Sequence, residues 1–542
     1  MRVLLAGVLL LLFCAPPASA GPFTWRVVKT HWTASDERGF EKFVTAIGKS
    51  DCSSSESCMR SDANPYRGSD PRGFDIDVDC AKWPYFLRAY YAWKNGLPFS
   101  YVNQISGEGD DLRYSSTANQ AISRFDIVDH GEGIDGPSAI YALIRSVYSG
   151  TYRTDVRAEH GVLSDFYAPA IGPDTIRPGT IIYDINGHVG IVWKVDKDGR
   201  IFYMDAHPDF SVTRSVYGAQ FGQSPPWLGG GFKDWRPFKL DGAHRDAEGN
   251  LIGGHMDYAE NDQIPGFSLV QYLGTENNPS GSVKDSRYAY DGEALGFYEY
   301  VRAAVSGGKM DYNPVFELKE TMKTLCNDLH DRAQYVEQAT AERIEDKPHP
   351  DHLPGNIYGS SDPTWESYAT PSRDARIRAA FAQFYKDMAN MIQLWIDRDP
   401  KIVYDGQFLK KDLLAAYEKQ SAACTITYLS SDEHPVTLTF DDMVHDLYAM
   451  SFDPYDCTEL RWGDDKPSCS DGPDKLAWYK DEQRLRNETD ADDGSTMNFK
   501  LADLEHHKKG SGVDDPPPVD VKALIENMGE QIVFTGMAPV GH

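Results

Sequence analysis

The chain has 542 residues, which is enough for two or three domains with substantial cores. It carries 82 acidic against 54 basic side chains, and its formal net charge is -28. Such a surface excludes nucleic acids and anionic membranes as partners, because binding to phosphates depends on clustered lysine and arginine.

The first 20 residues have the features of an export signal. Arg2 precedes an almost purely apolar run from Val3 to Phe13, and Ala18-Ser19-Ala20 form the small-residue pattern that a signal peptidase recognises. The apolar run is shorter than the roughly 20 residues that a membrane-spanning helix needs. We therefore expect a cleaved signal at residues 1–20 and an exported protein, periplasmic or secreted, with no stable membrane insertion.

Export permits disulfide bonds, so the spacing of the cysteines is informative. Removing the signal takes away Cys14 and leaves seven of the eight cysteines, an odd number that requires at least one unpaired thiol within the chain. The simplest pairing joins neighbours across short polar loops and two cysteines in or beside helical stretches: Cys52 with Cys58, Cys457 with Cys469, and Cys326 with Cys424. Under this pairing Cys80 is the free thiol.

The part from residue 21 to about 285 is rich in glycine, proline and aromatic residues and contains short β-like runs. Three of these runs, at 180–183, 189–195 and 201–205, predict strands. Asp196-Lys197-Asp198-Gly199 connects the last two and predicts a hairpin turn, because glycine tolerates positive φ.

A helix is predicted over residues 80–93, with Cys80 at its start. Aromatic and apolar residues recur there at helical spacing, and Asn95-Gly96 followed by Pro98 is a strong stop signal. The N-terminal end of a helix carries partial positive charge and free N–H groups, which stabilise a thiolate and can form part of an oxyanion hole. Cys80 is therefore the candidate nucleophile.

The nucleophile needs a base, and the base needs a group that orients it. His188 opens the first strand of the predicted hairpin and is the best candidate base. Asp205 and His207 return to the level of His188 along the partner strand, and they share one face because they lie two residues apart. Either can orient His188. We favour Asp205, because a carboxylate also stabilises the imidazolium ion.

A series of short motifs surrounds these residues. In chain order they are Pro65-Tyr66-Arg67-Gly68, Gly73-Phe74-Asp75, Asp79-Cys80, Asn95-Gly96-Leu97-Pro98, Arg177-Pro178-Gly179-Thr180 and Gly187-His188-Val189-Gly190-Ile191. Between about residues 63 and 209 this series resembles the NlpC-type and CHAP-like cysteine peptidases (amidases) of the papain-like superfamily. The resemblance implies an α+β, papain-like catalytic domain with an antiparallel sheet over residues 21–285.

The resemblance also implies roles for individual residues. Cys80 would be the nucleophile, His188 the base, and Asp205 or His207 the third polar residue. Tyr66 would take the place of the tyrosine that lines the family's oxyanion site. The expected reaction is hydrolysis of amide bonds, and peptides of peptidoglycan are the first expected substrate.

The sequence departs from the family pattern in three places. Ile76-Asp77-Val78 separate the Gly-Phe-Asp motif from Asp79-Cys80, and Cys80 is followed by Ala81-Lys82-Trp83 instead of Ser-Gly. The insertion at about 99–178 is also longer than usual. These departures leave the substrate class open. A transglutaminase-like enzyme or a protein-directed cysteine protease is one alternative, and a non-catalytic secreted scaffold or binding protein is another.

The C-terminal half has a different pattern. Long helical stretches are predicted at 292–305, 316–343, 373–396 and 408–423. We expect residues 286–487 to form a mainly α-helical domain that presents substrate or binds a protein partner. The segment 370–376 is interpreted as a helix start capped by Ser372 or Asp374, in preference to a functional groove. Residues 488–542 are predicted to be an acidic, proline-containing linker and C-terminal tail.

Clustered histidines are candidate metal ligands. His244, His255 and Asp257 are close in sequence, but they occupy a glycine-rich stretch without the helical HExxH frame of a zinc enzyme. We therefore expect no metal site and no cofactor.

Overall fold

The computed structural model describes residues 23–109, 111–185, 187–207, 210–219, 221–276, 278, 280, 282–355, 363–368, 371–464, 472–489 and 497–529. The fold is of the mixed α+β class, with helices and small antiparallel sheets, as the sequence predicts. The signal expected at residues 1–20 lies outside the described residues.

The largest sheet has six strands, each antiparallel to its neighbours. In spatial order they are β3 (Phe166–Tyr167), β8 (Gly231–Trp235), β4 (Ile181–Tyr183), β5 (Val189–Val195), β6 (Ile201–Ala206) and β7 (Val212–Val216). The three strands predicted from the sequence are confirmed to within one residue at each end. Gly199 adopts a φ of 82° in the turn between β5 and β6, a conformation that favours glycine.

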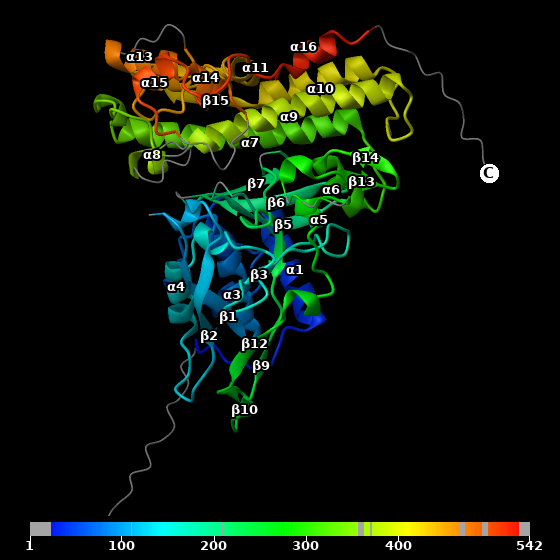
Figure 1. Ribbon diagram of the computed structural model, residues 1–542, viewed down its shortest axis with the longest axis vertical. Coiled ribbons are helices and arrows are strands. Elements are labelled where there is room, and N and C mark those ends of the chain that lie inside the picture. Colours follow the sequence, from blue (N-terminus) through cyan, green and yellow to red (C-terminus); the bar gives the residue numbers. More distant parts are fainter. Residues whose placement is uncertain are drawn as a thin grey trace, which may run out of the picture.

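Both faces of this sheet are covered. Ile181 and Tyr183 of β4 belong to the core shared with helices α1 (Ala34–Lys49) and α3 (Lys82–Asn95). Ile182, between them, belongs to a second core with helix α6 (Phe297–Ser306), because successive side chains of a strand point to opposite faces. In Figure 1 the N-terminal helices and α6 accordingly lie on opposite sides of the sheet.

Smaller elements extend the N-terminal half. A hairpin of β1 (Phe99–Ser106) with β2 (Gln120–Ile127) and helix α4 (Gly136–Ser146) occupy the insertion after α3. The remaining short elements of this half are α2 (Ser55–Arg60), β9 (Phe238–Asp241), β10 (His244–Arg245), β11 (Leu251–Ile252), β12 (His255–Tyr258), α5 (Val270–Leu273), β13 (Tyr288–Tyr290) and β14 (Glu293–Leu295).

Three long helices form a layer above the sheet (Figure 1). They are α7 (Pro314–Ala341), α9 (Pro371–Ile396) and α10 (Leu409–Ala423), and each overlaps a helix predicted from the sequence. Helix α7 contacts β7 on one side and α9 and α10 on the other, so it joins the helical layer to the sheet.

The rest of the C-terminal half consists of short elements packed around these helices. They are α8 (Pro363–Tyr368), β15 (Thr425–Leu429), β16 (Pro435–Thr439), α11 (Phe440–His445), α12 (Thr458–Arg461), α13 (Pro473–Asp481), α14 (Gln483–Asn487), α15 (Leu501–Glu505) and α16 (Val521–Glu526).

Parts of the segment predicted as a linker pack on the body of the protein. Met497, Phe499 and Leu504 are buried in an apolar cluster at one end of the helical layer. Helix α16, in the C-terminal tail beyond the predicted linker, packs against α9 and α10. Composition alone does not reveal this packing, because it shows the acidic character of the segment and not where its few apolar residues lie. The polar residues 490–496 lie outside the described part.

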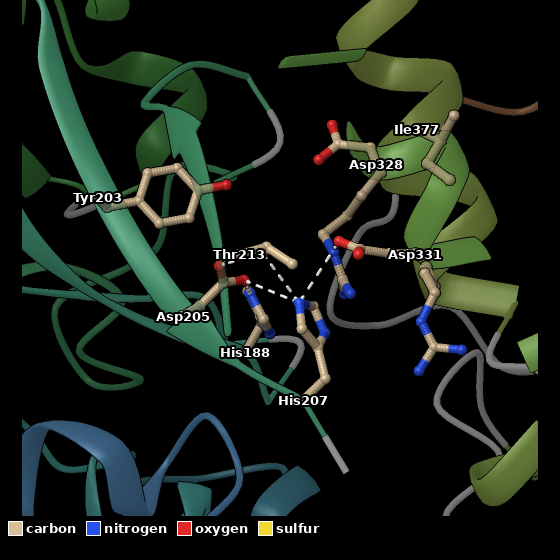
Figure 2. A pocket seen from close by; sticks show the side chains of 10 residues that line it. His188, Tyr203, Asp205, His207, Thr213, Asp328, Asp331 and Ile377 are labelled. Atoms are coloured by element: carbon tan, nitrogen blue, oxygen red, sulfur yellow. Dashed lines mark hydrogen bonds and ion pairs between the residues drawn. The ribbon is translucent and has the colours of Figure 1, made fainter. Parts of the chain in front are cut away.

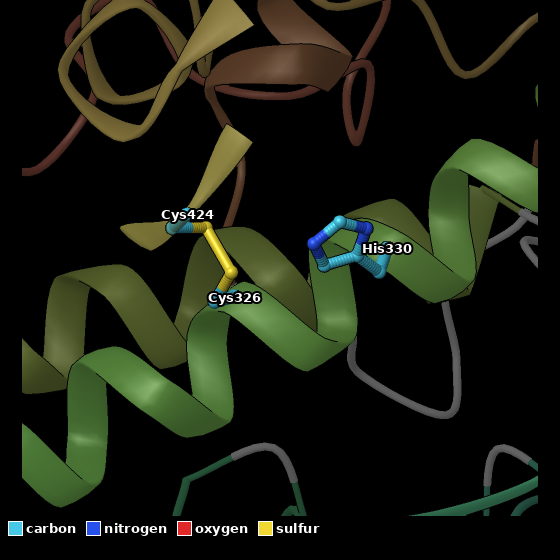
Figure 3. Close-up of side chains that lie close together, drawn as sticks. All are labelled: Cys326, His330 and Cys424. Carbon is cyan, nitrogen blue, oxygen red and sulfur yellow. A yellow bond between two sulfur atoms is a disulfide. The ribbon is translucent and has the colours of Figure 1, made fainter. Parts of the chain in front are cut away.

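The disulfides agree with the pairing expected from the sequence. Cys52 is bonded to Cys58, and Cys326 of α7 is bonded to Cys424 at the end of α10 (Figure 3). Cys457 is also disulfide-bonded, and its expected partner Cys469 lies outside the described residues. Within the described part, the free cysteine is Cys80. None of the helices described has the length and apolar character needed to cross a bilayer.

Candidate active site

His188 is placed by the strand that it precedes. Gly187, with a φ of 86°, turns the chain into β5, and His188 follows immediately. The ladder between β5 and β6 pairs Ile191 with Met204. Continued by three residues, this antiparallel register sets His188 opposite His207 and diagonal to Asp205, so the three side chains share one face.

Asp205 is the residue that holds the His188 ring. His188 Nε2 lies 2.6 Å from Asp205 Oδ2, and the Thr213 hydroxyl donates to Asp205 Oδ1 at 2.7 Å (Figure 2). Burial alone would raise the pKa of Asp205, but the charge of His207 and the hydrogen bonds from His188 and Thr213 outweigh it and lower the pKa to about 2. Asp205 is therefore ionised at neutral pH.

His207 lies beside this pair without bonding to His188. Its Nε2 is 3.0 Å from Thr213 Oγ1, 3.7 Å from Asp205 Oδ2 and 3.6 Å from Asp331 Oδ2. The two histidine rings are 6.0 Å apart between centroids. Of the two candidates for orienting His188, the structure thus brings Asp205 into hydrogen-bond contact.

Cys80 lies against the backbone of His188. Its Sγ is 3.8 Å from the carbonyl oxygen of Gly187, and the N–H of Val189 donates to the sulfur. The thiol is thus enclosed between the residues that precede and follow the candidate base. The side chain is partly buried.

The pKa of the Cys80 thiol contradicts the expectation of a stabilised thiolate. Burial, together with the negative charge of Asp79, raises this pKa to about 12. The helix begins at Lys82, two residues after the cysteine, and Asp79 Oδ1 accepts from the Lys82 N–H at 3.2 Å. The positive end of the helix therefore faces the Asp79 carboxylate instead of the sulfur.

The prediction for Tyr66 is also wrong. Its hydroxyl bonds to Asn95, the last residue of α3, with Asn95 Nδ2 donating at 3.0 Å. Cys80 lies before the first residue of the same helix. A helix of 14 residues is about 21 Å long, so Tyr66 lies too far from the sulfur to stabilise an oxyanion there.

A small cavity opens where the sheet meets the helical layer. Its volume is about 50 Å³, and its lining residues are His188, Tyr203, Asp205, His207, Thr213, Asp328, Asp331, Arg373, Arg376 and Ile377. The residues from His188 to Thr213 come from the sheet side, and those from Asp328 to Ile377 come from α7 and α9 (Figure 2). Cys80 is not one of the described residues on the cavity wall.

The helical wall supplies charged groups that the sequence did not associate with the site. Burial and the charge of Asp205 raise the pKa of Asp328 to about 7. Arg373 stacks on the Tyr335 ring, with its guanidinium carbon 3.3 Å from the ring centroid. The only sequence signal for this wall was segment 370–376, interpreted as a helix start.

That interpretation is only partly right. Helix α9 does begin there, at Pro371. Asp374 is buried, however, and accepts from Arg332 of α7 at 3.1 Å, so it joins two helices instead of capping one. The Ser372 side chain lies outside the described part. The segment thus combines a packing role with a place in the cavity wall.

The histidines considered for metal binding lie apart from the cavity. His244 and His255 are exposed and belong to different hairpins, β10–β11 and β9–β12.

Comparison of the chain with protein-family models, with curated proteins and with solved structures gave no match.

Proposed function

We propose that the chain is an exported cysteine hydrolase that cleaves amide bonds, with Cys80 as nucleophile, His188 as base and Asp205 as the group that orients the base. One observation carries the proposal. The only free cysteine of the described residues lies against the backbone on both sides of His188, while His188 Nε2 is bonded to Asp205 at 2.6 Å. The candidate nucleophile thus lies beside the main chain that carries the candidate base, and a carboxylate holds the ring of that base.

The bond to Asp205 assigns roles to the two ring nitrogens. Nε2 donates to the ionised carboxylate, which leaves Nδ1 as the basic nitrogen of a neutral ring. Because the pKa of the Cys80 thiol is about 12, His188 has to take the proton as the sulfur attacks. The Sγ–carbon bond forms, the carbon–nitrogen bond breaks and the proton passes to the leaving amine. Water then hydrolyses the thioester.

The arrangement of α3 and the sheet supports the papain-like assignment for residues of about 63–209. The helix that follows the cysteine packs against β5, the strand that follows the histidine. The sheet is antiparallel, as the resemblance to the NlpC-type family implies. The disulfides support the exported location.

The cavity bears on the substrate. Arg373 and Arg376 provide two guanidinium groups on the wall opposite His188, and guanidinium groups bind carboxylates well. We therefore propose peptides with a free carboxylate, such as those of peptidoglycan. A cavity of about 50 Å³ is far smaller than a usual ligand pocket of roughly 300–1,000 Å³, so α7 and α9 have to move away from the sheet when a peptide binds.

The test uses muropeptides and measures the release of new amino groups. Wild type and Tyr66→Phe should release amine at similar rates, because Tyr66 bonds to the far end of α3. Cys80→Ala should be at least about 10³-fold slower, because the attacking atom is gone. Equal rates for wild type and Cys80→Ala would reject the thiol mechanism.

A second candidate is a hydrolase in which the His188–Asp205 pair activates water. It is favoured by the cavity, which is lined by His188 and Asp205 but not by Cys80. The same assay separates the two candidates. If water is the nucleophile, Cys80→Ala retains activity and His188→Ala loses it. If the thiol is the nucleophile, both variants lose activity.

A further inference from the structure

A second cluster of a histidine and carboxylates lies at the far end of the helical layer. His349 follows α7 in the chain, Asp453 lies between α11 and α12, and Glu482 lies between α13 and α14. Asp453 and Glu482 are 0% exposed, and the side chain of the partly buried His349 is 3% exposed. One possible ligand atom from each residue lies within 4.8 Å of the other two.

The His349 ring is fixed with one nitrogen directed at this cluster. Its Nδ1 lies 2.6 Å from the carbonyl oxygen of Pro350, which can only accept, so the proton is on Nδ1. Nε2 lies 2.7 Å from Asp453 Oδ2. The ring stacks on Trp478 with 4.2 Å between centroids. A metal-binding histidine is characteristically oriented by such a bond from its other nitrogen.

The carboxylates are unequally satisfied. Asp453 Oδ1 accepts from the N–H of Tyr455 at 2.8 Å, which leaves Oδ2 directed at His349. Neither oxygen of Glu482 has a hydrogen-bond partner, although the residue is completely buried. Arg486 Nη1 lies 3.8 Å from Glu482 Oε2, beyond hydrogen-bond distance. An unsatisfied buried carboxylate is costly and calls for a compensating positive group.

Further charged side chains surround the cluster. Asp456 is also buried and interacts electrostatically with Glu482. Two buried arginines, Arg461 and Arg486, interact electrostatically with Asp453 and Asp456. Three buried carboxylates thus lie near the His349 ring and these two guanidinium groups.

We propose that His349 Nε2, Asp453 Oδ2 and a Glu482 carboxylate oxygen bind one divalent transition-metal ion, with Zn²⁺ as the expected ion. A mixed set of one imidazole and two carboxylates suits zinc better than calcium or magnesium, which take oxygen ligands. Ligand atoms of a tetrahedral zinc site are about 3.3–3.4 Å apart, so shifts of about 1 Å close this cluster around an ion.

The ion has a structural role. It joins three connecting segments, around residues 349, 453 and 482, at the end of the layer where long helices give way to short ones. Cross-linking of such distant segments stabilises the folded state against the unfolded chain. The site is separate from the cavity, with which it shares no residue.

A second group with metal ligands, Cys326, His330 and Cys424, does not carry this inference. Its two sulfur atoms are bonded to each other, so they are not thiolate ligands, and His330 is exposed (Figure 3).

The test measures zinc content and thermal unfolding of the full chain without an affinity tag, under non-reducing conditions. After loading with ZnCl₂ and dialysis, the wild type should retain about one zinc ion per chain. EDTA should lower its Tm, and ZnCl₂ should restore it. CaCl₂ should not restore it, because calcium does not favour a nitrogen ligand.

His352→Ala is the matched control for His349→Ala. His352 also directs its Nδ1 at the carbonyl that follows it, Leu353 at 2.8 Å, but its side chain is half exposed and outside the cluster. His349→Ala and Glu482→Gln should lose the zinc and the response to EDTA, and His352→Ala should keep both. Glu482→Gln preserves the shape of the side chain, so it serves if His349→Ala fails to fold.

Three results overturn the proposal. One is a wild-type protein that retains no zinc and whose Tm is unchanged by EDTA and ZnCl₂. In that case His349 and Asp453 are an imidazolium–carboxylate pair. Another is equal zinc retention by His349→Ala and His352→Ala. The third is a rise in Tm with CaCl₂ as large as that with ZnCl₂, which would indicate nonspecific binding of cations to acidic side chains.

Discussion

Two clusters in the described part of the chain, His188 with Asp205 and His349 with Asp453 and Glu482, combine a histidine with buried carboxylates, and they differ in the hydrogen bonds that these carboxylates accept. Both oxygens of Asp205 have a partner, His188 on one side and the Thr213 hydroxyl on the other. Neither oxygen of Glu482 has a hydrogen-bond partner. The comparison teaches that residue types alone do not set a role. A satisfied carboxylate can hold a base in place, whereas an unsatisfied buried one needs a further cation.

The largest expected effect comes from breaking the satisfied pair. Asp205→Asn should lower kcat for amine release by about 10³–10⁴-fold, because an amide neither stabilises the imidazolium nor fixes the proton on Nε2. The muropeptide assay measures it. Asp331→Asn, which removes a charge from the same cavity, should lower kcat less than about tenfold. Equal losses in both variants would show that the charge of the cavity matters and the pair does not.

Asp328 lines the same cavity as Asp205, but its pKa is raised whereas the pKa of Asp205 is lowered. Its folded-state pKa of about 7 lies above the usual 3.8, so the folded protein binds this proton more tightly than the unfolded chain does. The contribution of this proton to the stability of the folded state is complete below about pH 4 and is lost as the pH rises through 7.

Asp328→Asn removes this dependence, because asparagine does not ionise. The stability of the variant relative to wild type should therefore rise between pH 4 and pH 8, by on the order of 2 kcal/mol. Urea unfolding at a series of pH values measures the difference. Parallel stability curves for the two proteins would mean that Asp328 titrates normally.

The smallest expected effect is on the free energy of unfolding, and its sign differs between the two clusters. In EDTA, Glu482→Gln should raise the free energy of unfolding, by about 1 kcal/mol, because it removes a buried charge that no donor satisfies. Asp205→Asn should lower it by about 1–3 kcal/mol, because two hydrogen bonds to a charged group are weakened. Chemical unfolding in EDTA compares them. A loss of equal size in both variants would remove the distinction between the clusters.

The sequence predicted the part of the site that depends on local pairing. A hairpin between β5 and β6 follows from two apolar runs and a turn at Asp196 to Gly199, and antiparallel pairing then brings Asp205 to His188. The position of Cys80 beside these strands rested on the motif series, and the structure places its sulfur at Gly187.

The rest depends on contacts between distant segments. Asp328 and Arg376 reach the cavity because α7 and α9 pack over the sheet, and no local pattern marks that packing. His349 and Glu482 are more than 130 residues apart and lie in unrelated connecting segments. The raised pKa of the Cys80 thiol also escaped the sequence, because it comes first from burial of the sulfur by distant segments and second from the neighbouring charge of Asp79.

The central claim is that His188 acts on Cys80, and alkylation of the native protein by iodoacetamide tests it without a substrate. Peptide mapping locates the label. His207→Ala is the control, because His207 also lines the cavity but the Cys80 sulfur lies against the main chain at Gly187 and not at His207. With a thiol pKa of about 12, labelling near pH 7 depends on a base. We expect His188→Ala to slow the labelling of Cys80 at least about tenfold and His207→Ala to leave it unchanged. Equal labelling rates in wild type and His188→Ala would contradict the central claim.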